Sequence, residues 1–122
     1  MESFVHWVDI PARDLARAKT FYATVLGLTF KDDVTVGESR IAEIVGADAS
    51  HSGCIVQGPY HKPSAEGVLI YLDGGDDLAN VLGKVGAAGG KVVDEKYPDG
   101  QQGFIGTFID TEGNKIGLYS TK

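Results

Sequence analysis

Two side chains on one strand-like segment are candidates for chemistry. Residues 4–10 are rich in β-branched and aromatic residues, and within them Trp7 and Asp9 share one face because alternate residues of a strand point the same way. A carboxylate in an apolar strand needs a partner or a function. Asp9 is therefore predicted to act as a general base or to bind a polar ligand group. The alternatives are an ion pair with an arginine such as Arg13 or Arg40, or simple exposure to water.

Aromatic and amide side chains elsewhere extend this candidate site. Tyr71 belongs to a second strand-like segment, residues 68–72, and with Trp7 it could stack on a planar ligand. The alternative for both rings is ordinary packing on a sheet. Gln57, near the end of the first half of the chain, could reach the mouth of the same pocket. The predicted ligand-binding set is Trp7, Asp9, Gln57 and Tyr71.

The cysteine and the histidines give weaker signals. Cys54 could be a nucleophile if paired with His51, but free cysteines are usually buried, and nothing nearby in sequence lowers its pKa. His6 is predicted to pack or hydrogen-bond at a strand edge, while His51 and His61 fall in loop-like segments and are predicted to be solvated. A metal site built from His6, Glu43 and His61 is conceivable, but no ligand spacing supports it.

Composition excludes several classes of protein. The chain has 122 residues, 43% of them hydrophobic, which is ordinary for a globular domain and argues against disorder. No apolar run approaches the roughly 18 residues needed to cross a bilayer, so no membrane partner is expected. A net charge of −6 without a basic cluster argues against nucleic acid. The first residues carry no signal-peptide pattern, and a cytoplasmic location is expected.

The elements that would position these residues follow one plan used twice. In each half a strand is followed by an aspartate suited to cap a helix, then an apolar stripe of helical spacing, then glycine. The first helix is predicted to run from its cap Asp14 to Gly27, and the second from Asp77 to the pair Gly89-Gly90. The tripeptide Asp-Leu-Ala occurs at 14–16 and again at 77–79.

Short strands are predicted around these helices, with turns between them. About three follow each helix, so that two units could curve into a shared concave sheet. Residues 58–67 are predicted to connect the units. Residues 94–102 are predicted to form a polar loop, in which Tyr97 and Gln102 are minor site candidates. The pair Gly74-Gly75 is predicted to form a bulge. The predicted strands are 28–30, 34–36, 40–45, 54–57, 91–93, 104–109 and 115–119, with Gly113 in the turn between the last two.

Several motifs together carry a resemblance to a known family. They are Asp14–Ala18, Phe21-Tyr22, Val25–Gly27, Ala87–Gly90 and Asp110–Ile116. With them the chain resembles, over nearly its whole length, the vicinal oxygen chelate superfamily of glyoxalases, bleomycin-resistance proteins and extradiol dioxygenases. The resemblance implies an α+β fold in which paired βαβββ modules form a curved, partly open mixed sheet barrel with helices on the outside. The whole chain, 1–122, would be a single glyoxalase-like domain, with module one at about 1–60 and module two at about 66–122.

The resemblance also implies where a divalent metal would bind. Metal-dependent members carry one ligand on the first and one on the last strand of each module. The matching positions here are Trp7, Leu69 or Ile70, Gly117, and a position near Gln57. Tryptophan, leucine, isoleucine and glycine offer no side-chain lone pair suited to such a metal. A metal cofactor is therefore disfavoured, and no other cofactor is expected.

These observations favour one function and leave another open. The first is metal-independent binding of a small organic molecule in the concave sheet, by a protein that the resemblance implies is a homodimer. The second is a metal-dependent lyase, isomerase or dioxygenase, and whether any reaction is catalysed stays open. Fold alone does not decide between them.

Overall fold

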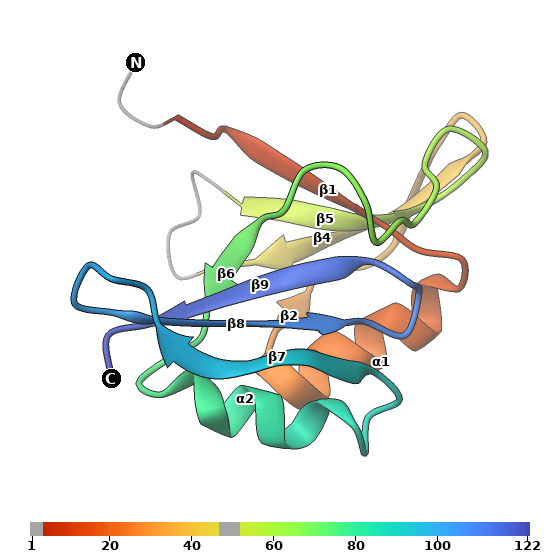
Figure 1. Cartoon of the computed structure of the whole chain (residues 1–122). Helices are drawn as coiled ribbons and strands as arrows, with labels where there is room; N and C mark the ends of the chain where they lie inside the picture. Colours follow the sequence, from red (N-terminus) through yellow and green to blue (C-terminus); the bar gives the residue numbers. More distant parts are fainter. Residues whose placement is uncertain (1–3, 47–51) are drawn as a thin grey trace.

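The computed structural model describes residues 4–46 and 52–122, which form two helices and nine strands (Figure 1). The first half contains β1 (Trp7–Pro11), α1 (Leu15–Leu26), β2 (Thr29–Phe30), β3 (Val34–Val36), β4 (Ser39–Val45) and β5 (Ser52–Gln57). The second half contains β6 (Tyr71–Asp73), α2 (Leu78–Val85), β7 (Lys91–Pro98), β8 (Phe104–Ile109) and β9 (Lys115–Ser120).

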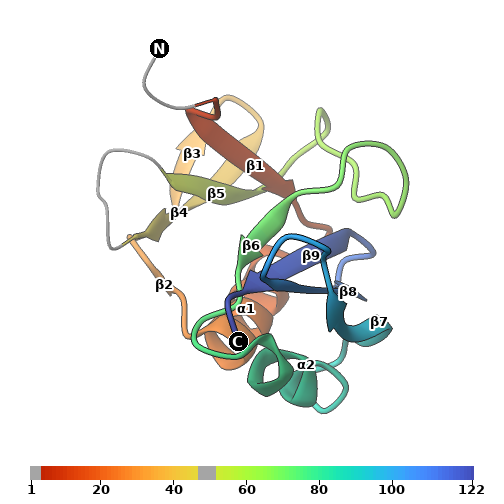
Figure 2. The same ribbon diagram turned by 60° about the vertical axis from the view of Figure 1, so that its left-hand side comes forward.

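The strands form two sheets of the same design. One has the order β1-β5-β4-β2, with β3 also paired to β4, and the other has the order β6-β9-β8-β7. In each, the first strand of the module is an edge strand that pairs in parallel with the last strand. The edges β1 and β6 face each other across the molecule (Figure 2). The fold is thus α+β with paired βαβββ modules, as predicted, and the predicted barrel is open, because the two sheets remain separate.

Both helices begin as their sequences predict. The side chain of Asp14 accepts a hydrogen bond from the Arg17 amide at 3.1 Å, and that of Asp77 accepts one from the Ala79 amide at 2.9 Å. Helix α1 ends at Gly27, which has φ of 67°, the left-handed conformation that glycine adopts most easily. Helix α2 ends at Val85, several residues before the predicted glycine pair, and residues 86–89 form a turn.

The helices lie together on one side of the molecule (Figure 1). Helix α1 packs on β4 and β5, helix α2 packs on β7, β8 and β9, and the two helices contact each other. Phe21 of α1 packs against Phe108 of β8, with ring centroids 5.8 Å apart, so one apolar core joins both modules. The opposite faces of the sheets stay uncovered and carry exposed aromatic side chains, among them Trp7 and Tyr71.

Two predictions about connecting segments are wrong. Residues 94–98 belong to β7 rather than to a loop, because two register shifts against β8 let this polar segment continue its pairing. The pair Gly74-Gly75 forms the connection from β6 to α2 rather than a bulge. A Cβ at Gly74 would lie 2.7 Å from the Cβ of Leu78, so only glycine allows the helix to start this close to the strand.

Neither helix within the described ranges has the length and apolar character needed to cross a membrane.

Candidate ligand-binding cleft

A cavity of about 690 Å³ lies between the facing edges of β1 and β6, and we call it the β1–β6 cleft. Residues 5–10 line one wall, and Tyr71, Leu72 and Asp73 line the other. Apolar side chains from α1 and β4, including Leu26 and Ile44, contribute further surface. A concave, mainly apolar cavity with a few polar groups is the usual form of a small-molecule site.

Three of the four predicted site residues line this cleft. Trp7 and Asp9 come from β1 and Tyr71 comes from β6, and all three are partly exposed. Tyr71 is 62 or more residues from Trp7 and Asp9 in the sequence, and the packing of both sheets on the same pair of helices brings the three side chains together. His6 also lines the cleft.

Asp9 is the centre of a polar cluster on the uncovered face of β1. Its Oδ1 accepts hydrogen bonds from Trp7 Nε1 at 2.9 Å and Cys54 Sγ at 3.2 Å, and its Oδ2 lies 3.0 Å from His61 Nε2. Burial raises the pKa of Asp9, but the hydrogen bonds from Cys54, His61 and Trp7 outweigh this and leave the pKa below its ordinary value. Asp9 is therefore a carboxylate at neutral pH. Neither Arg13 nor Arg40, its predicted alternative partners, is bonded to it.

Cys54 is a poor nucleophile in this setting. Its side chain is 2% exposed, and burial together with the hydrogen bond to the Asp9 carboxylate raises the pKa of the thiol to about 12. The thiolate is the reactive form of cysteine, so at neutral pH the protonated Cys54 thiol serves as a hydrogen-bond donor and not as a nucleophile. His51, its predicted partner, lies outside the described residues.

The ring of Tyr71 occupies the place where a metal ligand would project. Tyr71 pairs with Gly117 across β6 and β9, and a Cβ added to Gly117 would lie 2.6 Å from Tyr71 Cδ1. The uncovered face of β9 therefore carries an aromatic ring where metal-dependent relatives are expected to carry a ligand.

Backbone pairing also fixes the other three ligand positions. In module one the Ala12 amide donates to the Val56 carbonyl, and in module two the Gly74 amide donates to the Tyr119 carbonyl. These equivalent hydrogen bonds align the first strands of the two modules. In this alignment Leu69, rather than Ile70, is the equivalent of Trp7. Asp9 pairs with Cys54 as Tyr71 pairs with Gly117, so the equivalent of Gly117 is Cys54 and not Gln57.

The residues at these four positions do not fit a divalent metal. Trp7, Leu69 and Gly117 have no donor, and the thiol of Cys54 keeps its proton. Asp9, Cys54 and His61 are of metal-binding types, but their polar atoms bond to one another rather than converge on a point. No group of three His, Cys, Asp or Glu side chains in residues 4–46 and 52–122 is arranged to hold a metal ion.

The conceivable trio of His6, Glu43 and His61 does not assemble. Glu43 forms an ion pair with Lys31 at 2.6 Å, and His61 is bonded to Asp9. His61 is not a solvated loop residue: its side chain is 30% exposed, and its Nδ1 is buried with no hydrogen-bond partner in the described structure.

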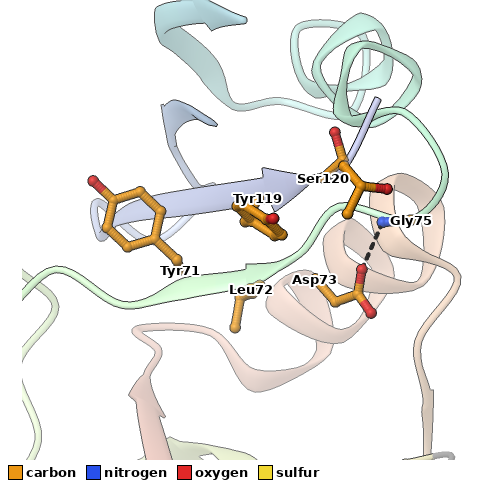
Figure 3. A pocket seen from close by; sticks show the side chains of 7 residues that line it. Tyr71, Leu72, Asp73, Gly75, Tyr119 and Ser120 are labelled. Atoms are coloured by element: carbon orange, nitrogen blue, oxygen red, sulfur yellow. Dashed lines mark hydrogen bonds between the residues drawn. The ribbon is translucent and has the colours of Figure 1, made fainter. Parts of the chain in front are cut away.

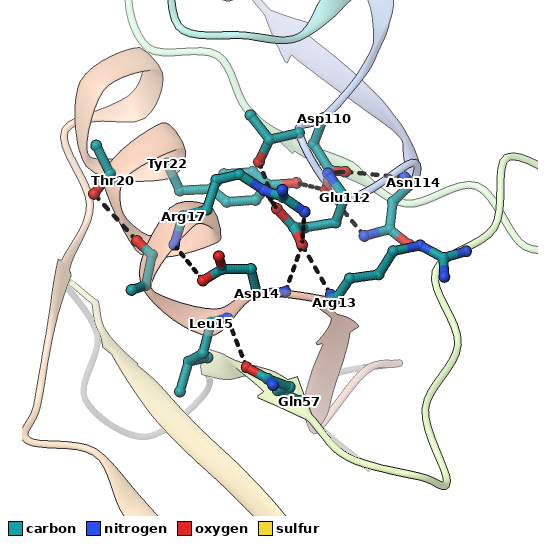
Figure 4. A network of polar contacts seen from close by, with 12 residues as sticks. Arg13, Asp14, Leu15, Arg17, Thr20, Tyr22, Gln57, Asp110, Glu112 and Asn114 are labelled. Atoms are coloured by element: carbon teal, nitrogen blue, oxygen red, sulfur yellow. Dashed lines mark hydrogen bonds and ion pairs between the residues drawn. The ribbon is translucent and has the colours of Figure 1, made fainter.

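Gln57 has a structural position instead of a place in the cleft. Its Oε1 accepts a hydrogen bond from the Leu15 amide at 2.8 Å, so it caps the first turn of α1. In Figure 4 it lies below a polar network that joins the 110–114 turn to the same end of the helix. Tyr97 and Gln102 lie in β7 and the turn after it, on the edge of the second sheet away from β6.

That network joins the two modules. The buried carboxylate of Glu112 accepts hydrogen bonds from the amides of Arg13 and Asp14, each at 2.8 Å, and forms an ion pair with Arg17 at 2.8 Å. Burial raises the pKa of Glu112, but these donors outweigh it and lower the pKa to about 2. The turn that follows β8 therefore holds the start of α1.

Sequence reasoning missed two residues of the cleft region. His61 reaches Asp9 from a segment predicted only as a connector, and no local pattern signals a contact that spans 52 residues. Asp73 lines the cleft at the end of β6, and a carboxylate directly after an apolar strand was an available signal.

Comparison with known proteins places the chain in a recognisable group. The sequence model of the Glyoxalase/Bleomycin resistance protein/Dioxygenase superfamily matches residues 4–118. "Putative glyoxylase CFP32" of Mycobacterium tuberculosis is 25% identical over 116 residues, which are 93% of this chain and 44% of that protein. The chain thus spans less than half the length of this curated relative.

Solved structures share the fold at low identity. A glyoxylase/bleomycin resistance protein/dioxygenase domain from Frankia sp. EAN1pec is 15% identical with a TM-score of 0.76, and all of both chains is covered. Glyoxalase I from Zea mays is 19% identical with a TM-score of 0.67, over 94% of this chain and 45% of that one. At such identities these likenesses establish the fold and not the chemistry.

Proposed function

Because the chain belongs to the Glyoxalase/Bleomycin resistance protein/Dioxygenase superfamily, we propose that it binds a small organic molecule in the β1–β6 cleft without a metal ion. The observation that carries this proposal is the cleft itself, a cavity of about 690 Å³ that collects Trp7, Asp9 and Tyr71 from two modules. The two aromatic rings offer flat apolar surface, and the carboxylate offers a fixed charge.

The chemistry of the ligand positions supports binding without a metal. Trp7, Leu69 and Gly117 bring no donor atom, and the Tyr71 ring fills the space above Gly117. The alternative, a metal-dependent lyase, isomerase or dioxygenase, would need donors from elsewhere in the molecule. We therefore favour a binding protein over that enzyme.

Trp7 is the single tryptophan of the chain and lies in the wall of the cleft, so its emission reports on the site. We expect titration with N-methylacridone, a neutral planar aromatic probe, to change Trp7 emission saturably, in the presence or absence of a chelator. Tyr71→Ala should weaken binding about fivefold, since it removes one ring from the cleft. Tyr97→Ala is the matched control, because Tyr97 is equally exposed, at 45% against 47%, but lies in β7.

Equal losses in the two tyrosine variants, or a change in emission that never saturates, would contradict binding in the cleft. Metal analysis of protein purified without chelator tests the alternative. Stoichiometric zinc, nickel, manganese or iron, together with loss of binding on chelation, would favour the metal-dependent enzyme.

We also propose that the protein is a cytoplasmic homodimer. The uncovered sheet faces carry exposed apolar side chains, including Val34 and Val36, which a second copy could cover. A single free, buried cysteine suits a reducing compartment. Sedimentation should give twice the mass of one chain, and a monomer at micromolar concentration would contradict the dimer.

A further inference from the structure

Two tyrosines form a shelf at the β6 end of the cleft, next to a recess of about 510 Å³ that shares Tyr71, Leu72 and Asp73 with it. Tyr71 and Tyr119 lie on the same face of neighbouring strands, while Leu72 points to the other side (Figure 3). Tyr71 packs over Gly117 and Tyr119 over Gly103, in space that a side chain there would fill. One side of each ring rests on glycine backbone, and the other side stays open. Tyr71 is 47% exposed and Tyr119 is 38% exposed.

The carboxylate of Asp73 stands beside this shelf. Asp73 pairs with Tyr119 across β6 and β9, and its Oδ1 accepts a hydrogen bond from the Gly75 amide at 2.9 Å. This bond fixes the side chain at the start of the connection to α2 (Figure 3). No lysine or arginine within the described ranges forms an ion pair with Asp73, so its charge has no internal partner.

The charged side chains that line the cleft and the neighbouring recess are negative. Among the described residues, those that line the cleft and the recess include Asp9 and Asp73 but no lysine or arginine, and His6 is the one basic type. Lys62 and Lys115 line a different recess, at the Asp9 end of β1, together with Glu66. The acidic character is therefore concentrated at the Asp73 end.

Asp9 and Asp73 differ in the number of hydrogen-bond partners that their carboxylates have within the protein. Asp9 accepts from Trp7 and Cys54 and contacts His61, so both of its oxygens have partners. Within the described residues, Asp73 accepts one hydrogen bond, from the backbone amide of Gly75. A ligand cation would gain more from Asp73, while Asp9 holds the Trp7 indole in the wall of the cleft.

We propose that the ligand of the β1–β6 cleft is an amphipathic organic cation, with its charged head on Tyr71, Tyr119 and Asp73 and its apolar body in the cleft beside Trp7. The faces of tyrosine and tryptophan rings attract cations, and an adjacent carboxylate adds a charge of the opposite sign. An anion in the same position would meet the negative charge of Asp73. This assignment rests on the proposed function and names the class of molecule that it would take.

Three probes with the same tricyclic ring test the proposal by equilibrium dialysis against the full chain. They are the cation N-methylacridinium, the neutral N-methylacridone and the anion acridine carboxylate. We expect the cation to bind about fivefold more tightly than the neutral probe at low salt, and the anion most weakly. The preference for the cation should decrease as salt is raised, because exposed charges are screened.

Variants locate the charge that is responsible. Asp73→Asn should reduce binding of N-methylacridinium about fivefold and leave N-methylacridone within a factor of about two. Glu95→Gln is the matched control: it also removes one exposed negative charge, but from β7, the edge of the sheet opposite to β6.

The outcomes separate this inference from the proposed function. Saturable binding of N-methylacridone with no gain for the cation, or equal losses in Asp73→Asn and Glu95→Gln, would overturn the cation assignment and leave the cleft as a binding site. Failure of all three probes to bind would overturn both.

Discussion

At the scale of single residues, Asp9 organises one wall of the cleft. Its carboxylate holds the Trp7 indole, the Cys54 thiol and the His61 ring, which come from three separate segments. Asp9 is therefore ionised at neutral pH and holds its neighbours in place by hydrogen bonds, so it is not a carboxylate free to act as a general base. Its effect on ligand binding is therefore expected to act through Trp7 as well as through its own charge.

Replacing Asp9 with asparagine tests this. Because the Asp9 side chain is 43% exposed, we expect Asp9→Asn to lower the free energy of unfolding by only about 1 kcal/mol while weakening binding of N-methylacridone. Denaturant titration and Trp7 emission measure the two effects. A loss of several kcal/mol without a change in affinity would make Asp9 a structural partner only.

The same carboxylate suppresses the reactivity of Cys54. With a thiol pKa of about 12 and 2% exposure, Cys54 in the native protein should react with iodoacetamide at about pH 8 at least about a hundredfold more slowly than in guanidinium. Asp9→Asn should speed the native reaction, because it removes the nearest negative charge. Native and unfolded rates within a factor of about three would show that the thiol is accessible and ionises readily.

At the scale of elements, the cleft exists because the first strand of each module is an edge strand. Strands β1 and β6 each pair on one side only, with β5 and β9, and the space between their free edges becomes the cavity. The glycines of β9 and of the turn before β8 then decide which side chains occupy the uncovered face. Glycine content thus shapes the site as well as the turns.

Gly117 provides a direct test at this scale. A Cβ at this position would lie 2.6 Å from the Tyr71 ring, and the half-exposed ring can move, so Gly117→Ala should cost less than about 1 kcal/mol of stability. Displacement of the ring should still weaken probe binding. Gly83→Ala is the control, because Gly83 lies in α2 and a Cβ added there would have no neighbouring atom within 4 Å. Unchanged affinity in Gly117→Ala would separate Tyr71 from the binding surface.

At the scale of the whole molecule, the two modules are held together by a shared core and by Glu112. The carboxylate of Glu112 follows β8 of module two and accepts hydrogen bonds at the start of α1 in module one (Figure 4). Close by, the hydroxyl of Tyr22 donates to Asp110 at 2.6 Å. The cleft lies between the same two modules, so we expect these contacts to influence its geometry.

Glu112 should make the stability of the protein depend on acid. Its folded pKa of about 2 lies below the ordinary value of 4.5, so its contribution is complete above about pH 4.5 and is lost as pH falls toward 2. The shift corresponds to about 3 kcal/mol for this buried group. Glu112→Gln should lower the free energy of unfolding by about that amount at neutral pH and flatten its decline in acid. Parallel pH curves for the two proteins would contradict this role.

The sequence by itself determined the elements and their order. Helical spacing, capping aspartates and the αL glycine at position 27 are local signals, and they predicted both helix starts and the paired modules correctly. The sequence also singled out Trp7, Asp9 and Tyr71, because polar and aromatic residues on apolar strands are visible in the pattern alone. The family followed from motifs spread over both halves.

Only the tertiary structure decided which of these residues meet. It separated Gln57 from the other three candidates, brought His61 to Asp9 across 52 positions, and aligned Cys54 with Gly117 through strand pairing. It also showed that the predicted, partly open barrel consists of two separate sheets with a cleft between their edges. Such contacts depend on the register and packing of segments distant in sequence, which no local pattern specifies, and they decide what the site can bind.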